Sequence, residues 1–114
     1  MFIVSIGGVK RFSVGNSIYG ASKAALQSMV NFTSQELASK KIRVNSICPG
    51  MVETPLIRGG TLTEEQLKED MDKYPLKRYG KPEDIAYASI YLLSEASSWL
   101  TGQSIVIDGG VTAK

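Results

Sequence analysis

The order of apolar runs and helical stretches along this chain constrains its fold more than any other feature. Short apolar runs at residues 2–6, 42–48 and 104–107 have the composition of buried strands. A helical pattern at residues 17–40 separates the first two runs, and a helical stretch that starts at residue 82 precedes the third. Strands that alternate with helices form parallel sheets through right-handed crossovers. The chain is therefore predicted to fold as an α/β domain with a parallel sheet.

The long helical pattern carries one apolar row, which should face the sheet. This row consists of Leu26, Met29, Val30, Thr33 and Leu37. Residues 51–61 contain Pro55, Gly59 and Gly60 and are predicted to form an irregular loop.

Two more helix starts follow from capping patterns. Thr63 and Gln66 have the spacing of a capping box, and Leu62 with Leu67 has the spacing of a hydrophobic staple. Pro82 suits the first position of a later helix, because its missing N–H has no helical partner there. We therefore expect a short helix after Thr63 and a longer one from Pro82.

Tyr19 and Lys23 lie four residues apart at the start of the long helix. Residues at this spacing share a helix face, so the phenol and the ammonium should point into the same space. A nearby cation favours the phenolate form, which helps a tyrosine to exchange protons near neutral pH. The pair is therefore a candidate for acid/base chemistry. Because the spacing is common, a half-buried tyrosine beside a solvated lysine is the alternative.

Composition argues against several classes of function. The net charge of +2 is spread over scattered Lys and Arg residues, without a basic block that would suit nucleic acid. No apolar run approaches the ~20 residues of a membrane span, and the first residues do not resemble a signal peptide. Histidine is absent, which removes His-based zinc sites, and we expect no metal. The single Cys48 is expected to be an inert core thiol, which suits a reducing cytoplasm.

Four motifs give the chain a resemblance to the short-chain dehydrogenase/reductase family. They are YGASK at residues 19–23, NSICPGMVETP at 45–55, RYGKPEDIA at 78–86 and TGQSIVIDGG at 101–110. Each motif alone is moderately specific, but four in this order over nearly the whole chain are very specific. The resemblance implies a Rossmann-like, doubly wound parallel sheet, of which this chain supplies the last three strands and their helices.

The resemblance also implies a Ser-Tyr-Lys catalytic set. Tyr19 would be the acid/base that gives a proton to a carbonyl oxygen or takes one from an alcohol, and Lys23 would bind the nicotinamide ribose hydroxyls. A serine at the end of the preceding strand would hold the substrate oxygen, and Ser5 fits this place best. The gap between Ser5 and Tyr19 is slightly longer than is usual in the family, so Ser13 and Ser17 are weaker candidates for the same role.

A nicotinamide cofactor, NAD or NADP, is implied at the end of the second strand. Pro49 and Gly50 turn the chain at the carboxyl edge of the sheet, where open α/β sheets bind ligands, and a glycine tolerates close approach of a ligand. By resemblance, the Val52 backbone would meet the nicotinamide carboxamide, and Thr54 would hydrogen-bond the carboxamide or the pyrophosphate. Residues 53–62 resemble a mobile substrate lid, and an ordinary connection is the alternative.

The glycine-rich turn with which the family binds pyrophosphate has no counterpart in this sequence. Residues 1–114 are therefore expected to be the carboxyl-terminal half of a single NAD(P)-binding Rossmann-like domain, with the amino-terminal half absent. A truncated gene, a split reading frame or a mis-called start would each give this sequence, and the sequence does not choose among them.

Two functions in different classes remain open. In the first, the chain belongs to an oxidoreductase that moves hydride between NAD(P)(H) and a small-molecule alcohol or ketone. The full-length enzyme would be cytoplasmic and a homodimer or homotetramer, with the helix at residues 17–40 at the contact. In the second, the chain is a catalytically inactive remnant that only associates with partners. Neither function involves nucleic acid or a membrane.

Overall fold

Three parallel strands form the centre of the molecule. The structure is a computed structural model that describes residues 1–60 and 63–113. The strands are β1 (Phe2–Ile3), β2 (Ser46–Pro49) and β3 (Ser104–Ile107), and they form one sheet in the order β1-β2-β3. Both neighbouring pairs run parallel, which confirms the predicted α/β architecture.

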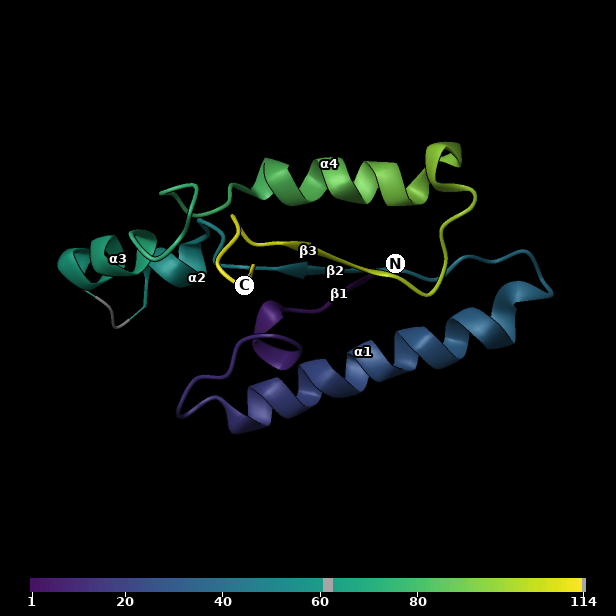
Figure 1. Cartoon of the computed structure of the whole chain (residues 1–114), viewed down its shortest axis with the longest axis horizontal. Coiled ribbons are helices and arrows are strands. Elements are labelled where there is room, and N and C mark those ends of the chain that lie inside the picture. Colours follow the sequence, from purple (N-terminus) through teal and green to yellow (C-terminus); the bar gives the residue numbers. More distant parts are fainter. Residues whose placement is uncertain (61–62, 114) are drawn as a thin grey trace.

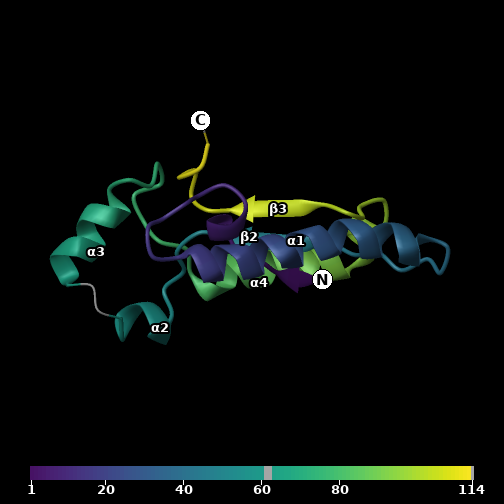
Figure 2. The same cartoon turned by 90° about the horizontal axis from the view of Figure 1, so that it is seen from below.

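Helices cover both faces of this sheet. The long helix α1 (Ser17–Ala38) lies on one face, and α4 (Pro82–Leu93) lies on the other (Figure 1). Two short helices, α2 (Pro55–Arg58) and α3 (Glu64–Met71), lie beyond the end of the sheet at which β2 finishes (Figure 2). The segment that follows β2 therefore lies at the carboxyl edge of the sheet, where α/β folds bind their ligands.

The hydrophobic core lies between the sheet and α1. Val4, Ile6 and Cys48 are buried and contact one another. Four partly buried side chains pack against this cluster: Phe2, Leu26, Val106 and Val111. Burial raises the pKa of the Cys48 thiol, which keeps it protonated and fits the expectation of an inert core cysteine.

The predicted apolar row of α1 is correct except at one residue. Val30 is fully buried and Leu26 is partly buried, but Met29 is 42% exposed. Instead, the buried row runs from Val30 to Ser34. Ser34 lies one helical turn after Val30 and packs against Gly102. Met29 lies about 100° around the helix from Val30 and therefore faces outward.

The first two strands are shorter than predicted. Residues 2–6 were expected to form one strand, but pairing ends after Val4, and the 3₁₀ turn η1 (Ile6–Gly8) follows. The Ser5 hydroxyl accepts a hydrogen bond from the Gly7 N–H at 3.0 Å, and this cap starts the turn. The buried apolar residues of this run therefore split between a strand and a turn, a distinction that apolar composition does not make.

The second strand was expected at residues 42–48 and begins later, at Ser46. The Ile42 N–H still bonds the carbonyl of Leu37, and Lys41 has a φ of 58°. Residue 42 therefore belongs to the end of α1 rather than to the sheet, while the third predicted strand, 104–107, is confirmed.

The helix starts were largely predicted, and one short helix was missed. Residues 51–61 were expected to be irregular but contain α2, whose first residue is Pro55. The capping box of Thr63 and Gln66 is present at the start of α3, and Pro82 is the first residue of α4. The proposed staple with Leu62 lies outside the described residues. No helix within residues 1–60 and 63–113 has the length and apolarity needed to cross a bilayer.

Candidate functional site

The first two turns of α1 bring Tyr19 and Lys23 together. The Lys23 Nζ atom lies 5.7 Å from the centroid of the Tyr19 ring, and the Tyr19 side chain is about half exposed. The same Nζ donates a hydrogen bond to the carbonyl of Ile3 at 3.2 Å, which ties α1 to the end of β1. The predicted juxtaposition of phenol and ammonium is therefore present, with the phenol accessible to a ligand.

Ser5 lies beside Tyr19, with Gly7 between them. A Cβ atom on Gly7 would lie 3.4 Å from the Ser5 Oγ and 3.4 Å from Tyr19 Cε1. Because the Ser5 oxygen accepts the Gly7 N–H, its position is fixed while its own proton remains available for donation. The hydroxyl and the phenol ring thus border one small space.

Close backbone packing holds these two segments together. A Cβ atom on Gly8 would lie 2.5 Å from the Cβ of Lys23 and 2.8 Å from the backbone nitrogen of Ala24. A Cβ on Gly20 would lie 3.1 Å from the carbonyl oxygen of Gly7. Because these glycines have no side chains, η1 can pack directly on α1. This contact places Ser5 next to Tyr19.

The alternative serines are placed differently. Ser13 is exposed on the loop before α1, and Ser17 is the exposed first residue of α1. Neither hydroxyl has a hydrogen-bond partner within residues 1–60 and 63–113, whereas the Ser5 hydroxyl is held by backbone. Of the three serines, Ser5 has the best-defined position relative to Tyr19.

The candidate cofactor residues follow directly on β2. Pro49 is the last residue of β2, and the Gly50 N–H donates to the carbonyl of Ile107 at 2.9 Å. A Cβ atom on Gly50 would lie 3.0 Å from the Cα and Cβ of Asp108. The group that approaches Gly50 closely is therefore Asp108 of this chain, a packing reason for glycine that the sequence did not indicate.

Val52 and Thr54 present polar groups that have no partner among residues 1–60 and 63–113. Val52 forms an isolated parallel bridge with Gly80, made by the carbonyl of Met51 and the N–H of Glu53. In such a bridge the N–H and C=O of the central residue point away from the partner, and those of Val52 have no partner in the described part of the chain. Thr54 precedes α2 in an extended conformation, and its hydroxyl makes no capping bond.

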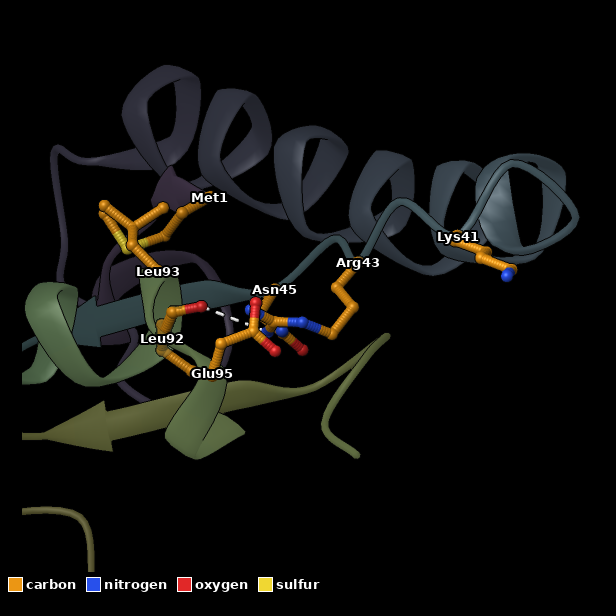
Figure 3. A pocket seen from close by; sticks show the side chains of 7 residues that line it. All are labelled: Met1, Lys41, Arg43, Asn45, Leu92, Leu93 and Glu95. Atoms are coloured by element: carbon orange, nitrogen blue, oxygen red, sulfur yellow. Dashed lines mark hydrogen bonds between the residues drawn. The ribbon is translucent and has the colours of Figure 1, made fainter. Parts of the chain in front are cut away.

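Two pockets among the described residues do not include a predicted site residue. One, of about 270 Å³, lies at the carboxyl ends of β2 and β3 and is lined in part by Met51, Gly80 and Ile107. The other, of about 230 Å³, opens at the opposite end of the sheet (Figure 3). Its lining consists of Met1, Lys41, Arg43, Asn45, Leu92, Leu93 and Glu95. The predicted site residues thus lie outside both of these pockets, and Tyr19 is about half exposed.

The polar pocket in Figure 3 has a structural explanation. The Arg43 guanidinium donates to the carbonyls of Leu92, Ser94 and Leu100 and to the hydroxyl of Ser97. It thereby satisfies carbonyl groups at the end of α4, where the helix dipole favours a cation. This arginine therefore acts as a cap at the end of α4.

Sequence reasoning missed one polar cluster beside the site. Arg11, from the loop between Ser5 and Tyr19, contacts Asp70 of α3 and the hydroxyl of Tyr74. Arg11 is separated from Asp70 and Tyr74 by about sixty positions, so no local spacing signals these contacts.

Comparisons with known proteins show which proteins this chain is similar to. The family model described as Enoyl-(Acyl carrier protein) reductase matches residues 1–112. A 3-oxoacyl-(acyl-carrier-protein) reductase of Thermotoga maritima is 42% identical over 97 residues, which cover 85% of this chain and 39% of the relative. A tropinone reductase homolog of Arabidopsis thaliana is 41% identical over 108 residues, which cover 95% of this chain and 41% of the relative. The chain therefore spans about two fifths of the length of these relatives.

Solved structures agree with the sequence comparison. A short-chain type dehydrogenase/reductase from Mycobacterium ulcerans superposes with a TM-score of 0.90 at 35% identity, over 98% of this chain and 40% of that chain. A 4-hydroxyisoleucine dehydrogenase in complex with NADH superposes with a TM-score of 0.91 at 33% identity, over 98% of this chain and 46% of that chain.

Proposed function

Because the chain belongs to the short-chain dehydrogenase/reductase family, we propose that it supplies the proton-transfer residues of an oxidoreductase that acts on a small-molecule alcohol or ketone. The observation that carries the proposal is the arrangement of Ser5, Gly7 and Tyr19. The Ser5 hydroxyl and the Tyr19 ring border the same small space, and Lys23 lies one helical turn beyond. This arrangement can hold and protonate one oxygen atom of a substrate.

Each residue has a chemical role in this proposal. The Ser5 hydroxyl donates a hydrogen bond to the substrate oxygen, because its own oxygen is already held by the Gly7 N–H. Tyr19 gives its proton to that oxygen when a ketone is reduced, and takes a proton from it when an alcohol is oxidised. Lys23 places a positive charge beside the Tyr19 ring and, when cofactor is bound, contacts the ribose hydroxyls.

The residues after β2 fit a nicotinamide cofactor, NAD or NADP, which when bound supplies or accepts the hydride. The N–H and C=O of Val52 have no partner in the part of the chain that the structure describes, and they are complementary to a carboxamide, which has both a donor and an acceptor. The Thr54 hydroxyl can add a further hydrogen bond. Pro49 and Gly50 set the direction of this segment, because the Gly50 N–H completes the last bond to β3.

The proposal is tested in a chimera in which this chain replaces the matching segment of the Thermotoga maritima relative. We expect NAD(P)H-dependent reduction of a 3-oxoacyl thioester or of a small ketone from a panel. Tyr19→Phe should lower turnover by roughly 10²–10⁴-fold and leave the cofactor Kd nearly unchanged, because it removes a proton and little else. Tyr87→Phe is the control, since Tyr87 is an exposed tyrosine on α4. A Tyr19→Phe chimera that keeps more than about a tenth of its activity would contradict the role of Tyr19.

The serine assignment is tested in the same chimera. Ser5→Ala should reduce turnover strongly. Ser13→Ala and Ser17→Ala should change it less than about twofold, because the hydroxyls of Ser13 and Ser17 are exposed and have no partner among the described residues. An equal loss at Ser13 would mean that the loop between Ser5 and Tyr19 changes its conformation when substrate binds.

We also propose that α1 contributes to self-association. A second apolar row, Ala25, Met29 and Phe32, is exposed on the side of α1 that does not face the core. Phe32 is 67% exposed, and an apolar row of this kind is usually covered by a partner. A homodimer or homotetramer of the full-length protein would cover it.

One observation favours the inactive alternative for the chain by itself. β1 is an edge strand that pairs with β2, and Ile3 in it is 43% exposed. Exposed apolar edges pair with other chains, so residues 1–114 alone should be marginally soluble. Without a pyrophosphate site, they should also bind NAD(P)H too weakly to detect. Size-exclusion chromatography and calorimetry of the isolated chain test this, and a monomer with micromolar cofactor affinity would refute the alternative.

A further inference from the structure

Four polar side chains from separate parts of the chain meet beside the candidate site. The Arg11 guanidinium lies 3.3 Å from Asp70 Oδ1 and 3.4 Å from the Tyr74 hydroxyl oxygen. The Tyr79 hydroxyl donates to Asp70 Oδ2 at 3.1 Å. The Tyr74 hydroxyl also accepts the N–H of Met51 at 3.2 Å. This cluster, Arg11, Asp70, Tyr74 and Tyr79, connects the loop before α1, helix α3 and the segment after β2.

The cluster is a well-packed part of the molecule. Tyr74 is 1% exposed and Tyr79 is 3% exposed, and their rings meet edge to face with centroids 5.5 Å apart. Burial acts to raise the pKa of Asp70, but hydrogen bonds from Lys73, Tyr79 and Arg11 outweigh it and hold that pKa below its usual value. The carboxylate therefore stays ionised and attracts Arg11 in a partly desolvated setting, where charge pairs are stronger than on an open surface.

The loop that joins Ser5 to Tyr19 depends on this contact. Phe12, Val14 and Ile18 are each more than 80% exposed, so they do not anchor the loop. Across residues 9–16, the side chain of Arg11 makes the hydrogen bonds that reach a distant segment of the described chain, and the others are local backbone bonds. Helix α3 likewise has no buried side chain of its own. The cluster therefore joins each of these elements to a distant segment of the described chain.

We propose that Arg11 is a positioning residue, which aligns the Ser5–Tyr19 loop with the segment that faces the cofactor. The link runs from Arg11 to the Tyr74 hydroxyl and on to the Met51 N–H, next to Val52. The catalytic consequence rests on the function proposed above, whereas the mechanical link does not. Arg11 touches no reacting atom in this proposal, because it acts through the backbone that carries Ser5 and Val52.

Amide hydrogen exchange tests the mechanical link without any need for activity. In Arg11→Met we expect about tenfold faster exchange at the N–H of Met51 and at the N–H groups of residues 9–11, which bond the Ile6 carbonyl. Lys73→Met is the matched control. It removes the same charge from the same carboxylate, but Lys73 lies three residues from Asp70 and bridges no distant segment. Equal exchange in the two variants would overturn the proposal, and the chimera serves for this measurement if the isolated chain aggregates.

Kinetics of the chimera then test the catalytic consequence. Arg11→Met should lower kcat by about tenfold with less than a twofold change in KM. Arg11→Lys should be intermediate, because an ammonium lacks the planar fork with which the guanidinium bonds Asp70 and Tyr74 through separate nitrogens. Arg11→Met combined with Asp70→Asn should be no slower than Asp70→Asn alone, because the Arg11–Asp70 contact that both variants remove is lost only once, whereas the bonds of Asp70 to Lys73 and Tyr79 are lost in Asp70→Asn in either background. Additive losses would overturn the proposal. A wild-type chimera without activity would refute the proposed function and leave the exchange test of Arg11 intact.

Discussion

Gly8→Ala gives the sharpest test of how the candidate site is assembled. The added Cβ would lie 2.5 Å from the Cβ of Lys23 and 2.8 Å from the Ala24 nitrogen. Carbon atoms in good contact are about 3.5–4.0 Å apart, so the methyl group is about 1 Å too close. Both contacts involve atoms at the main chain, which no rotamer change can move, and the substitution must therefore push η1 away from α1.

The expected cost can be worked out from these contacts. Overpacking costs typically about 1–3 kcal/mol, and a contact with backbone belongs at the upper end of that range. Replacing glycine by alanine also reduces the conformational entropy of the unfolded chain, and this effect stabilises the folded state by about 0.4–1 kcal/mol. We therefore expect the free energy of unfolding to fall by about 2 kcal/mol. A shift of about 1 Å between Ser5 and Tyr19 should also reduce turnover by about 10²-fold.

Urea unfolding and steady-state kinetics of the chimera measure both effects. Gly80→Ala is the matched control, because a Cβ there would meet its nearest neighbours at 3.5 Å, an ordinary contact. The free energy of unfolding of the control should lie within about 0.5 kcal/mol of the value for the parent chimera, or slightly above that value. If Gly8→Ala and Gly80→Ala unfold alike, the close packing of η1 on α1 is not what brings Ser5 to Tyr19.

Three further predictions follow from individual contacts. Lys23→Met should weaken cofactor binding and lower turnover, because it removes the cation beside the Tyr19 ring; unchanged cofactor titrations would argue against its role. Phe32→Gln should shift the chimera toward monomer in sedimentation, and a chimera that is already monomeric at micromolar concentration would rule out the α1 contact. The Arg78 guanidinium beside Asp84 holds the pKa of that carboxyl at about 2. Because this folded-state pKa is depressed, its stabilising effect is complete above the unfolded value near 4 and is lost as the pH falls toward 2. Asp84→Asn should flatten that part of the pH dependence of unfolding, and an unchanged slope would refute the pairing.

Much of the fold could be predicted because its signals are local. The strand at 104–107, the capping box of Thr63 and Gln66 and the helix start at Pro82 each depend on residues a few positions apart, and each is confirmed. The order of strands and helices was sufficient to predict a parallel sheet. Strand ends were less predictable, because the turn at Ser5 depends on a side-chain cap and not on apolar composition.

The candidate site also combines features that the sequence predicts with features that it does not predict. The sequence by itself determined that Tyr19 and Lys23 share a face, because residues one helical turn apart are neighbours whatever surrounds the helix. Only the tertiary structure decided that Ser5 lies beside Tyr19, that Asp108 packs on Gly50, and that Arg11 reaches Asp70 across 59 positions. Such contacts depend on how whole elements pack, since a few absent Cβ atoms and one buried polar cluster set the distances between them. The local sequence pattern therefore does not predict that packing.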